Sequence, residues 1–402
     1  MSGVNFLDKL LDGSEFQWKA LDGLGTFIRG SGIQKSDFTE SGAGCIHYGQ
    51  IHTHYGTWAT ETKSFIDREF SARLRKAHAG DLVIATTSED DEAVAKAVAW
   101  LGNEDVAVST DAYIYRHTIN PKYMSYFFQT EIFQSQKKPY ITGTKVRRIS
   151  GDSLAKIKIP IPCPDNSEKS LAIQAEIVRI LDAFTSLAAE LTAELTAELN
   201  TRKKQYAYYR DKLLSFEDVE WKTLGELAEN LDSMRKPITS GLREPGNIPY
   251  YGASGIVDYV KDYIFDCDIL LVSEDGANLL ARSTPIAFSV RGRSWVNNHA
   301  HVLKFETYAE RRYVEYYLNS IDLTPYISGA AQPKLNKKNL ESILIPSPSL
   351  GEKERIVAIL DKFDALTNSI SEGLPREIAL RQQQYAYYRD LLFSFPHAKP
   401  QL

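Results

Sequence analysis

The stretch Gln205–Asp211 reads QYAYYRD and decides the fold, because the same residues return at Gln384–Asp390, an offset of 384 − 205 = 179. The match continues towards the N-terminus at this offset without a gap, so that Ile177–Leu187 corresponds to Ile356–Leu366. Self-similarity of this length and constant spacing indicates two copies of one structural unit. The sequence therefore predicts a fold with an internal repeat.

Each copy carries apolar side chains at intervals of three and four residues, the spacing of a helix that packs along one face. We predict a central helical region at 166–217 and a distal one at 351–396. The circular repeat predicts that they pair as an antiparallel coiled coil about a pseudo-two-fold axis. Gly373 and Pro375 interrupt the second copy, and proline lacks the amide hydrogen that a helix interior needs. A break or kink is predicted there.

A second block repeats at a different offset and closes the pattern into a circle. Trp18 corresponds to Trp221, an offset of 221 − 18 = 203, and the DKLL of residues 8–11 returns at residues 211–214 at the same offset. The N-terminal segment thus copies the end of a repeat helix. We therefore expect the two ends of the chain to lie close together.

The fold class predicted from these blocks is α+β, with two mixed α/β domains alternating with the two helical regions. Leu82–Ala85 and Ile269–Val272 read as strands, and short helices are predicted near Pro121–Gln129 and Ala309–Asn319. Each mixed block is large enough for a core of its own. The predicted boundaries are 1–17 for the N-terminal segment, 18–165 and 218–350 for the mixed domains, 166–217 and 351–396 for the helical regions, and 397–402 for a tail.

Composition indicates an ordinary globular chain. The 402 residues carry 47 Lys and Arg against 52 Asp and Glu, a formal net charge of −5, so no overall positive charge points to nucleic acid or membrane. DNA binding would have to rely on local patches or on partners. The three cysteines form no CxxC pair, and no stretch approaches the roughly 18 apolar residues of a membrane span. We expect a cytoplasmic protein with no membrane partner.

No motif assembles a catalytic site, and we predict neither catalytic residues nor a bound metal. A phosphate-binding G-x-x-x-x-G-K-[ST] loop is absent, and Asn120–Tyr123 (NPKY) lacks the second proline of the Asn-Pro-Pro-Tyr loop of amino-methyltransferases. The Cys45–His54 cluster alternates like a strand and turn, which favours a structural role over a zinc site. His299 and His301 share a strand face and are predicted to make packing or surface polar contacts, and Ser273–Gly276 reads as a turn.

Basic residues gather at corresponding places in the two copies. Gly143–Pro162 matches Gly329–Pro348 at an offset of 329 − 143 = 186, and a basic cluster stands near the start of each segment. Repeated clusters fit the phosphates of a DNA duplex, whose backbone has a matching dyad, whereas a solvated surface is the alternative for any single cluster. The predicted DNA contacts are Lys145, Arg147 and Arg148 in the first copy, Lys334, Lys337 and Lys338 in the second, and the local groups Arg73, Arg75, Arg291 and Arg293.

With these residues in place, the chain resembles the specificity subunit of type I restriction–modification systems, most closely the type IC branch. The resemblance rests on IPIPCPDNSEKSLAIQAEIVRILDAF at 159–184, on AAELTAELTAEL at 188–199 and on the two QYAYYRD endings, and it covers the whole architecture. It implies a non-catalytic subunit whose two target-recognition domains, at 18–165 and 218–350, each read one half of a bipartite DNA site. The alternatives are a fused adenine-specific DNA methyltransferase–specificity enzyme and a pseudo-symmetric scaffold with no nucleic-acid role.

The resemblance also implies partners and cofactors. Two modification subunits would dock on the helical regions and carry S-adenosylmethionine. Restriction subunits would add ATP and Mg, and this chain would bind no cofactor itself. One helix seam cannot bury all the tyrosines of the repeat, so we predict docking surfaces there. The residues singled out are Tyr206, Tyr209, Tyr385 and Tyr388 for docking, and Leu191, Leu195 and Leu199, which end the four-residue units of a predicted spacer-setting helix.

Overall fold

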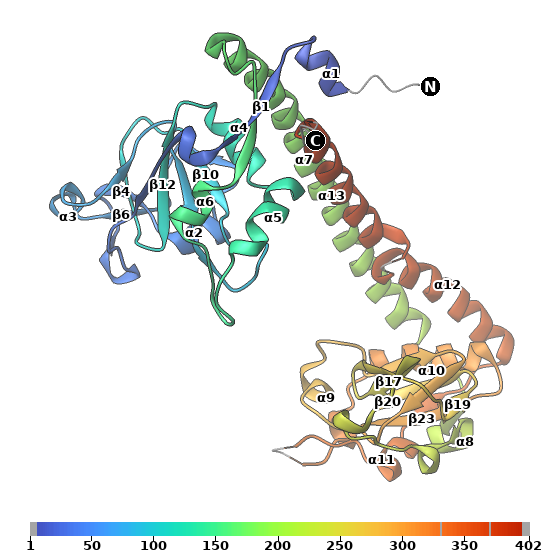
Figure 1. Ribbon diagram of the computed structural model, residues 1–402. Helices are drawn as coiled ribbons and strands as arrows, with labels where there is room; N and C mark the ends of the chain where they lie inside the picture. The colour runs from blue at the N-terminus through green and yellow to red at the C-terminus, as the bar shows by residue number, and fades with distance from the viewer. Residues whose placement is uncertain (1–5, 330–331, 370, 396–402) are drawn as a thin grey trace. The chain divides into compact units, whose positions relative to one another are not determined.

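The computed structural model describes residues 6–329, 332–369 and 371–395, and the chain divides into two compact units (Figure 1). Unit 1 combines residues 1–193 with residues 379–402, and unit 2 is Glu194–Ile378. The predicted tail at 397–402 lies outside the described residues. Each unit contains one mixed α/β domain and parts of the long helices.

The long helices occur where the repeat predicts them. Helix α7 (Ser167–Leu213) is unbroken, whereas the distal region consists of α12 (Leu350–Asn368) and α13 (Gly373–Leu392), so the predicted break is confirmed. Gly373 has a φ of +74°, and a Cβ added there would lie 2.4 Å from the carbonyl oxygen of Ala365. Only glycine fits this conformation, and the distal region is therefore two helices rather than one.

Two five-stranded sheets form the mixed domain of unit 1, in the orders β2-β12-β8-β10-β5 and β3-β6-β4-β11-β7. Both are mixed sheets, because β10 pairs parallel with β5 and β11 pairs parallel with β4, while their other pairs are antiparallel. The elements are α1 (Phe6–Leu11), β1 (Phe16–Ala20), β2 (Gly25–Arg29), β3 (Phe38–Thr39), β4 (Ala43–Ile46), α2 (Tyr48–Thr53), β5 (Trp58–Ala59), β6 (Ser64–Ile66), α3 (Arg68–Ala72), β7 (Lys76–Ala77), β8 (Leu82–Ala85), β9 (Thr87–Ser88), β10 (Ala97–Trp100), β11 (Val106–Val108), β12 (Ala112–His117), α4 (Pro121–Phe127), α5 (Glu131–Lys137), β13 (Arg147–Arg148), α6 (Gly151–Ala155) and β14 (Lys158–Pro162).

An aromatic core holds unit 1 together. Tyr123 and Phe127 of α4 are fully buried and pack with Phe133 of α5, whose ring centroid lies 5.9 Å from that of Phe127. Phe393, near the C-terminus, stands 4.9 Å from Tyr123, ring centroid to ring centroid. Large aromatic side chains contribute much of the apolar area in such a core. The C-terminal segment is thus part of the same core as the N-terminal domain.

Unit 2 contains two four-stranded sheets, β16-β23-β20-β21 and β18-β17-β22-β19. Helix α10 packs on β20 and β21 and against α12, and buries Tyr313 and Leu318 completely. The elements are β15 (Trp221–Thr223), α8 (Leu224–Leu227), β16 (Glu229–Asn230), β17 (Pro245–Gly252), β18 (Gly255–Val260), β19 (Phe265–Asp266), β20 (Ile269–Ser273), α9 (Asn278–Ala281), β21 (Ala287–Val290), β22 (Arg293–Val296), β23 (Ala300–Lys304), α10 (Tyr308–Ser320), α11 (Lys337–Glu341) and β24 (Leu344–Pro346).

A small antiparallel ladder closes each mixed domain, with equivalent residues opposite each other. In unit 1, β1 pairs with β14 and Trp18 lies opposite Pro160. In unit 2, β15 pairs with β24 and Trp221 lies opposite Pro346. The sequence repeat aligns these same two tryptophans and these same two prolines. The register of the ladders therefore follows the repeat.

The N-terminal and C-terminal segments meet in unit 1, as expected from the circular pattern. Leu7 and Leu11 of α1 are buried in the same cluster as Leu392, and the ring centroids of Phe16 and Phe395 lie 5.3 Å apart.

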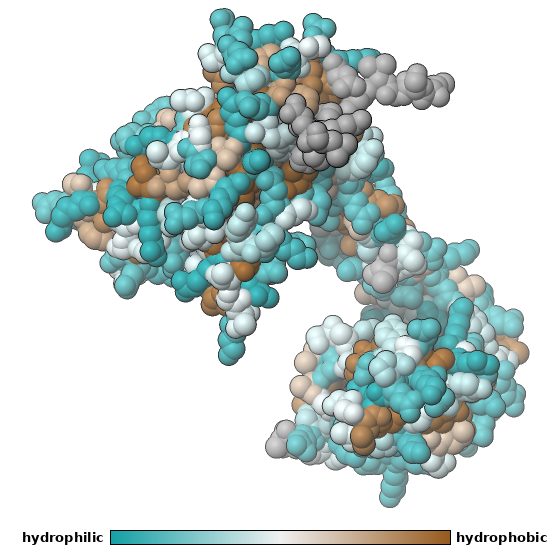
Figure 2. Space-filling view, viewed as in Figure 1, coloured by the Kyte–Doolittle hydropathy of each residue, from teal (hydrophilic) through white to brown (hydrophobic). Residues whose placement is uncertain are grey.

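In the view of Figure 2 the surface is mostly hydrophilic, with hydrophobic residues in small scattered groups. None of the helices in the described part of the chain combines the length and apolar character needed to cross a membrane.

Candidate nucleic-acid interface

A tight turn carries the first basic cluster. Thr142 and Arg148 face each other, and the backbone N–H of each donates to the carbonyl oxygen of the other at 2.9 and 2.8 Å. Gly143 has a φ of +89°, and a Cβ added there would lie 2.1 Å from the carbonyl oxygen of Val146. The turn therefore needs glycine at this position.

Unit 2 contains the matching turn. Ser328 and Lys334 exchange two backbone hydrogen bonds of 2.8 Å, and Gly329 has a φ of +83°. A Cβ on Gly329 would lie 2.5 Å from the carbonyl oxygen of Gln332. The residues at 330 and 331 are outside the described chain. The offset of 186 maps each of the four residues of the first turn onto its counterpart here.

A capped helix fixes each turn to the core. Ser150 caps α6 and Asn336 caps α11, each through a side-chain oxygen that accepts the backbone N–H three residues further on. Leu154 of α6 and Leu340 of α11 are completely buried. The polypeptide is therefore anchored directly after each basic turn.

The three cations of the first cluster differ in their surroundings. Lys145 and Arg148 are exposed. Arg147 is partly buried, lies 2.8 Å from the carboxylate of Asp91, and also donates to the carbonyl oxygen of Gly143. Lys145 and Arg148 are thus the more accessible members of the cluster.

The second cluster matches the first at a single position. Lys334 occupies the place that the repeat gives to Arg148, and its amino group lies 3.0 Å from the carboxylate of Glu274. Lys337 and Lys338 are exposed but lie in the first turn of α11 rather than in the preceding turn. Beyond Arg148 and Lys334, the two clusters place their cations differently.

The remaining predicted cations form two local pairs. Arg73 and Arg75 follow α3 and are exposed, and Arg75 also donates to a backbone carbonyl at 2.7 Å. Arg291 and Arg293 flank the turn between β21 and β22, and Arg293 lies 3.2 Å from the carboxylate of Asp266. Each pair thus occupies one short segment of its own unit.

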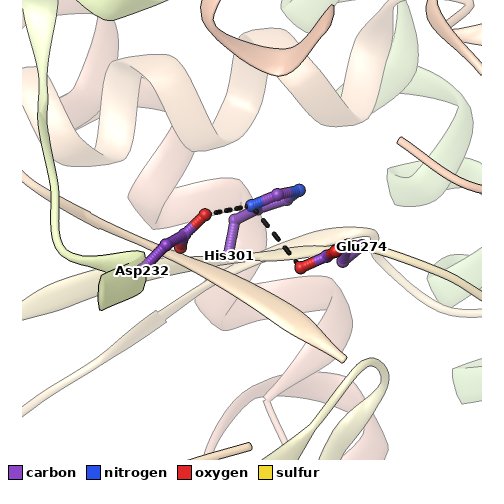
Figure 3. Close-up of side chains that lie close together, drawn as sticks. All are labelled: Asp232, Glu274 and His301. Carbon is purple, nitrogen blue, oxygen red and sulfur yellow. Dashed lines mark hydrogen bonds and ion pairs between the residues drawn. The ribbon is translucent and has the colours of Figure 1, made fainter. Parts of the chain in front are cut away.

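A buried charged network lies beside the turn of unit 2 (Figure 3). His301 is 1% exposed, with Nδ1 2.5 Å from Asp232 and Nε2 2.7 Å from the carbonyl oxygen of Leu335. Arg235 donates to Glu274 at 2.5 Å. Ligand atoms of Asp232, Glu274 and His301 lie within 4.8 Å of one another, which is close enough to consider a metal ion.

The contacts of this network explain it without a metal. Both ring nitrogens of His301 already lie within hydrogen-bond distance of protein oxygens, one of Asp232 and one of Leu335. Burial raises the pKa of Glu274, but hydrogen bonds from Arg235 and Lys334 outweigh it and lower the pKa below its ordinary value. The paired charges hold the base of the basic turn in place.

One sequence expectation changes at this network and one is confirmed. Ser273 is the last residue of β20 and Glu274 is a buried ion-pair partner, so the turn expected at Ser273–Gly276 is wrong in its first half. The spacing of the acidic residues gave no sign of the distant arginine that pairs with them. His299 lies 2.9 Å from the partly exposed Asp275, so the surface polar contact expected there is confirmed, whereas the polar contacts of His301 are buried.

The Cys45–His54 run is a strand followed by a helix, not a strand and turn. Strand β4 ends at Ile46, and α2 follows because His47 and Gln50 form a capping box around its first turn. The alternating pattern of the sequence did not predict this helix, because histidine is an unusual capping residue. Cys45 is buried, and burial raises the pKa of its thiol to about 12.

The same contacts join domain and helix in both units. Lys122 of α4 lies 2.8 Å from Asp182 of α7, and Arg312 of α10 lies 2.9 Å from Asp361 of α12. In each unit a tyrosine hydroxyl from the same short helix also donates to that carboxylate, at 2.8 and 2.6 Å. The repeat pairs Asp182 with Asp361. Each domain is thus fixed to its helix by an equivalent set of polar bonds.

The four tyrosines predicted to dock a partner also pack against their own unit. Tyr388 stacks on Phe184 with ring centroids 5.5 Å apart, and Tyr209 stacks on Phe363 at 5.7 Å. Tyr206 and Tyr385 are partly buried. Tyr209 remains 43% exposed and Tyr388 38% exposed, so each keeps an outer face. The three leucines of the four-residue units, Leu191, Leu195 and Leu199, are all partly buried along α7.

Comparison with known proteins agrees with this architecture. The chain matches the family described as the type I restriction modification DNA specificity domain over residues 14–201 and 217–380. The EcoR124I/EcoR124II specificity subunit of Escherichia coli is 45% identical over 262 residues, which cover 60% of this chain and 63% of that protein. The EcoprrI specificity subunit, also of Escherichia coli, is 33% identical over 92% of this chain and 93% of its own length. A putative specificity subunit of Haemophilus influenzae matches over only 49% of its length.

Solved structures share the fold at low sequence identity. One of them comes from work on complex assembly and conformational transition of the type I restriction–modification system. It has a TM-score of 0.62 at 16% identity, and the match covers 94% of this chain and 97% of that chain. The HsdS subunit of Thermoanaerobacter tengcongensis has a TM-score of 0.50 at 17% identity, covering 94% and 96%. The family match extends over both mixed domains and into the helices that follow them. The resemblance read from the sequence is confirmed, and the chain belongs to the type I restriction–modification DNA specificity family.

Proposed function

We propose that this chain is the DNA-specificity subunit of a type I restriction–modification complex. The mixed domains at 18–165 and 218–350 are its two target-recognition domains, and each reads one half of a bipartite DNA site. The observation that carries the proposal is the repeated basic turn, which holds Arg148 in one unit and Lys334 in the other at the same register, directly before a capped helix. Two equivalent cations on two equivalent turns match the two-fold symmetry of a duplex backbone.

The basic residues of the turns contact phosphates, and the diverged interiors of the domains read bases. Phosphate contacts position a protein on DNA without specifying sequence. This role fits Lys145, Arg148, Lys337 and Lys338, because their side chains are exposed. Arg147 and Lys334 are already paired with carboxylates, at 2.8 and 3.0 Å, and contribute after exchanging that partner for a phosphate. The pairs Arg73 with Arg75 and Arg291 with Arg293 add local positive charge.

The helical regions pair as an antiparallel coiled coil about a pseudo-two-fold axis and set the spacing between the half-sites. Two aromatic stacks support this pairing, Phe184 with Tyr388 and Phe363 with Tyr209. The repeat relates one stack to the other, because Phe184 corresponds to Phe363 and Tyr209 corresponds to Tyr388. The four-residue units ending in Leu191, Leu195 and Leu199 form the adjustable part of the spacer.

Two modification subunits dock on the helices, one near each exposed tyrosine face at Tyr209 and Tyr388. They supply S-adenosylmethionine and the methylation chemistry. Restriction subunits add ATP- and Mg-dependent translocation and cleavage. This chain itself contributes no catalytic residue. A fused methyltransferase is not favoured, because the sequence lacks both a nucleotide-binding glycine motif and an Asn-Pro-Pro-aromatic loop.

A gel-shift experiment tests this function. The chain alone, and the chain assembled with its modification subunit, are titrated with a duplex carrying the target site and with a duplex of scrambled sequence. We expect specific retention of the target by the assembled complex and weak binding by the chain alone. Equal affinity for the two duplexes at physiological salt would contradict the proposal.

A further inference from the structure

A polar pocket of about 720 Å³ opens beside the basic turn of unit 1. Helix α2, strand β9 with the loop after it, and Val146 at the tip of the turn form its walls. Strand β9 pairs with β13, so that Thr87 of the pocket lies directly opposite Arg148. Opposed residues in such a ladder have Cβ atoms about 5 Å apart. The pocket therefore adjoins the residues assigned to the DNA backbone.

Two polar atoms at this pocket have no hydrogen-bond partner within the described residues. They are Nδ1 of His52 and Oγ1 of Thr87, both shielded from solvent in the free chain. Thr87 is 5% exposed. An unsatisfied buried polar atom destabilises a fold by about 1–3 kcal/mol, so two beside one pocket call for a functional explanation.

The contacts determine what these two atoms can offer. Nε2 of His52 lies 2.9 Å from the carbonyl oxygen of Thr87, which only accepts, so Nε2 carries the hydrogen. Burial lowers the pKa of His52 and keeps the ring neutral, which leaves Nδ1 as an acceptor. The Thr87 hydroxyl is then free to donate. His52 is only partly buried and lines the pocket.

The charges around the pocket favour base edges over phosphate. Glu89 and Asp90 line it, and the amino group of Lys96 is turned to the carbonyl oxygen of Tyr55 at 3.0 Å. Carboxylates repel a phosphate but accept hydrogen bonds from the amino groups of bases. The pocket thus differs in kind from the cationic turn beside it.

In unit 2 the corresponding position is filled. There Lys334 lies opposite Asp275, and the preceding Glu274 is bonded to Arg235 and Lys334. In unit 1 the residue opposite Arg148 across the β9–β13 ladder is Thr87, and its hydroxyl is unpaired. The two units therefore present different chemistry at the same place in the fold.

We propose that the pocket of unit 1 reads a base in its half-site through His52 and Thr87, and that the base is adenine. The major-groove edge of adenine offers one donor at N6 and one acceptor at N7, which complement an acceptor and a donor hydroxyl. Guanine presents only acceptors on that edge, so it leaves Nδ1 of His52 unpaired. This assignment rests on the proposed DNA-specificity function and names the residues of unit 1 that read sequence.

Base analogues test the assignment on the complex with its modification subunit. After methylation mapping of the target, each adenine of the unit 1 half-site is replaced in turn by 7-deazaadenine, which lacks N7. We expect the wild-type complex to lose roughly fivefold in affinity at one position, since a hydrogen bond contributes about 1 kcal/mol. Thr87→Val should bind the natural target roughly fivefold more weakly and lose nothing further with the analogue. Thr87→Ser, which keeps the hydroxyl, and the exposed control Thr26→Val should behave as wild type.

The outcomes distinguish the assignment of the pocket from the proposed DNA-specificity function on which it rests. Equal binding of target and scrambled DNA by the wild-type complex would overturn the proposed function itself. Specific binding that is insensitive to 7-deazaadenine at every position would overturn the pocket assignment alone, whether or not the Thr87 variants fold. A Thr87→Val complex that keeps the full fivefold discrimination would do the same.

Discussion

At the scale of single residues, the two units show how one position in a fold can serve different ends. Opposite the basic turn, unit 1 has the uncharged Thr87 and unit 2 has Asp275, next to the buried Glu274. Arg148 and Lys334 were recognisable in the sequence because they stand at the same place in the repeat. The network behind Lys334 was not, because Arg235 and Glu274 are distant in sequence and no local spacing predicts that they meet.

Replacing Glu274 with Gln tests the role of this network in stability. Glu274→Gln should destabilise unit 2 by about 2 kcal/mol at pH 7, because it removes the closer of the two carboxylates that pair with the buried Arg235. The pKa of Glu274 is lowered in the fold, so its contribution is present above the unfolded pKa and is lost as pH falls through the folded value. The difference between wild type and variant should therefore shrink below about pH 4. Hydrogen exchange of the amides in β20 and β23 measures it.

Glu244→Gln is the matched control. Its carboxylate pairs with Lys261 at 2.9 Å, and both side chains are largely exposed. Exposed pairs contribute little to stability. No change in the exchange of β20 and β23 is expected, and equal effects of the two variants would remove the special role of the buried network.

The exposed cations of the first turn predict a change in salt dependence. Lys145→Ala with Arg148→Ala should weaken binding to target and scrambled DNA alike, because phosphate contacts position without specifying. The slope of log affinity against log salt should become shallower by about two. Fluorescence anisotropy over a salt series measures both. An altered target preference with an unchanged slope would show that these residues read bases.

At the scale of elements, the strength of the sequence signal determined what could be predicted. Strand β8 has the predicted bounds Leu82–Ala85, and α4 and α10 lie in the predicted segments, because their apolar periodicity is strong. The break before α13 followed from glycine and proline chemistry. Helix α2 was missed, because a histidine cap and a buried glutamine are weak local signals. Apolar periodicity shows which face of a helix or strand is buried, whereas a helix cap depends on a single side chain.

The unbroken helix α7 makes the spacer prediction specific. Deleting Thr192–Leu195 removes one four-residue unit, which shortens a helix by about 6 Å and turns it by roughly 400°, a net rotation of about 40°. A seam absorbs a four-residue change by local unwinding. B-DNA turns roughly 34–36° per base pair and rises about 3.4 Å, so the rotation matches one base pair while the rise must be absorbed elsewhere. Ser369, Ser371 and Glu372, which lie between α12 and α13 outside any helix, offer a place for this adjustment.

We therefore expect the deletion to leave both half-sites intact and to shorten the unspecified spacer by one base pair. Methylation mapping of the variant complex measures the spacer directly. Deleting Thr196–Leu199, the next unit of the same length, is a matched control and should give the same spacer. Full activity with an unchanged spacer would show that α7 does not measure the distance between half-sites.

At the scale of the whole molecule, the repeat predicted the scaffold but not the interiors. Equivalent ladders, turns and helix contacts recur because the residues that form them are copied, such as Trp18 with Trp221 and Asp182 with Asp361. The two larger sheets of each unit differ within the described residues, with five strands in each of those of unit 1 and four in each of those of unit 2. The pocket of unit 1 could not be predicted, since residues 52 and 87 meet only in the fold. Two domains that recognise different half-sites require different interiors on a common scaffold.

Exchange of one domain tests this modular account most directly. Residues 20–150 are replaced by the corresponding block of a family member with a different target, and the methylated sites of the variant complex are mapped by single-molecule sequencing. One half-site should change to that of the donor, while the other half-site and the spacer stay the same. A change in both half-sites, or in neither, would contradict the claim that each unit reads one half of the DNA site.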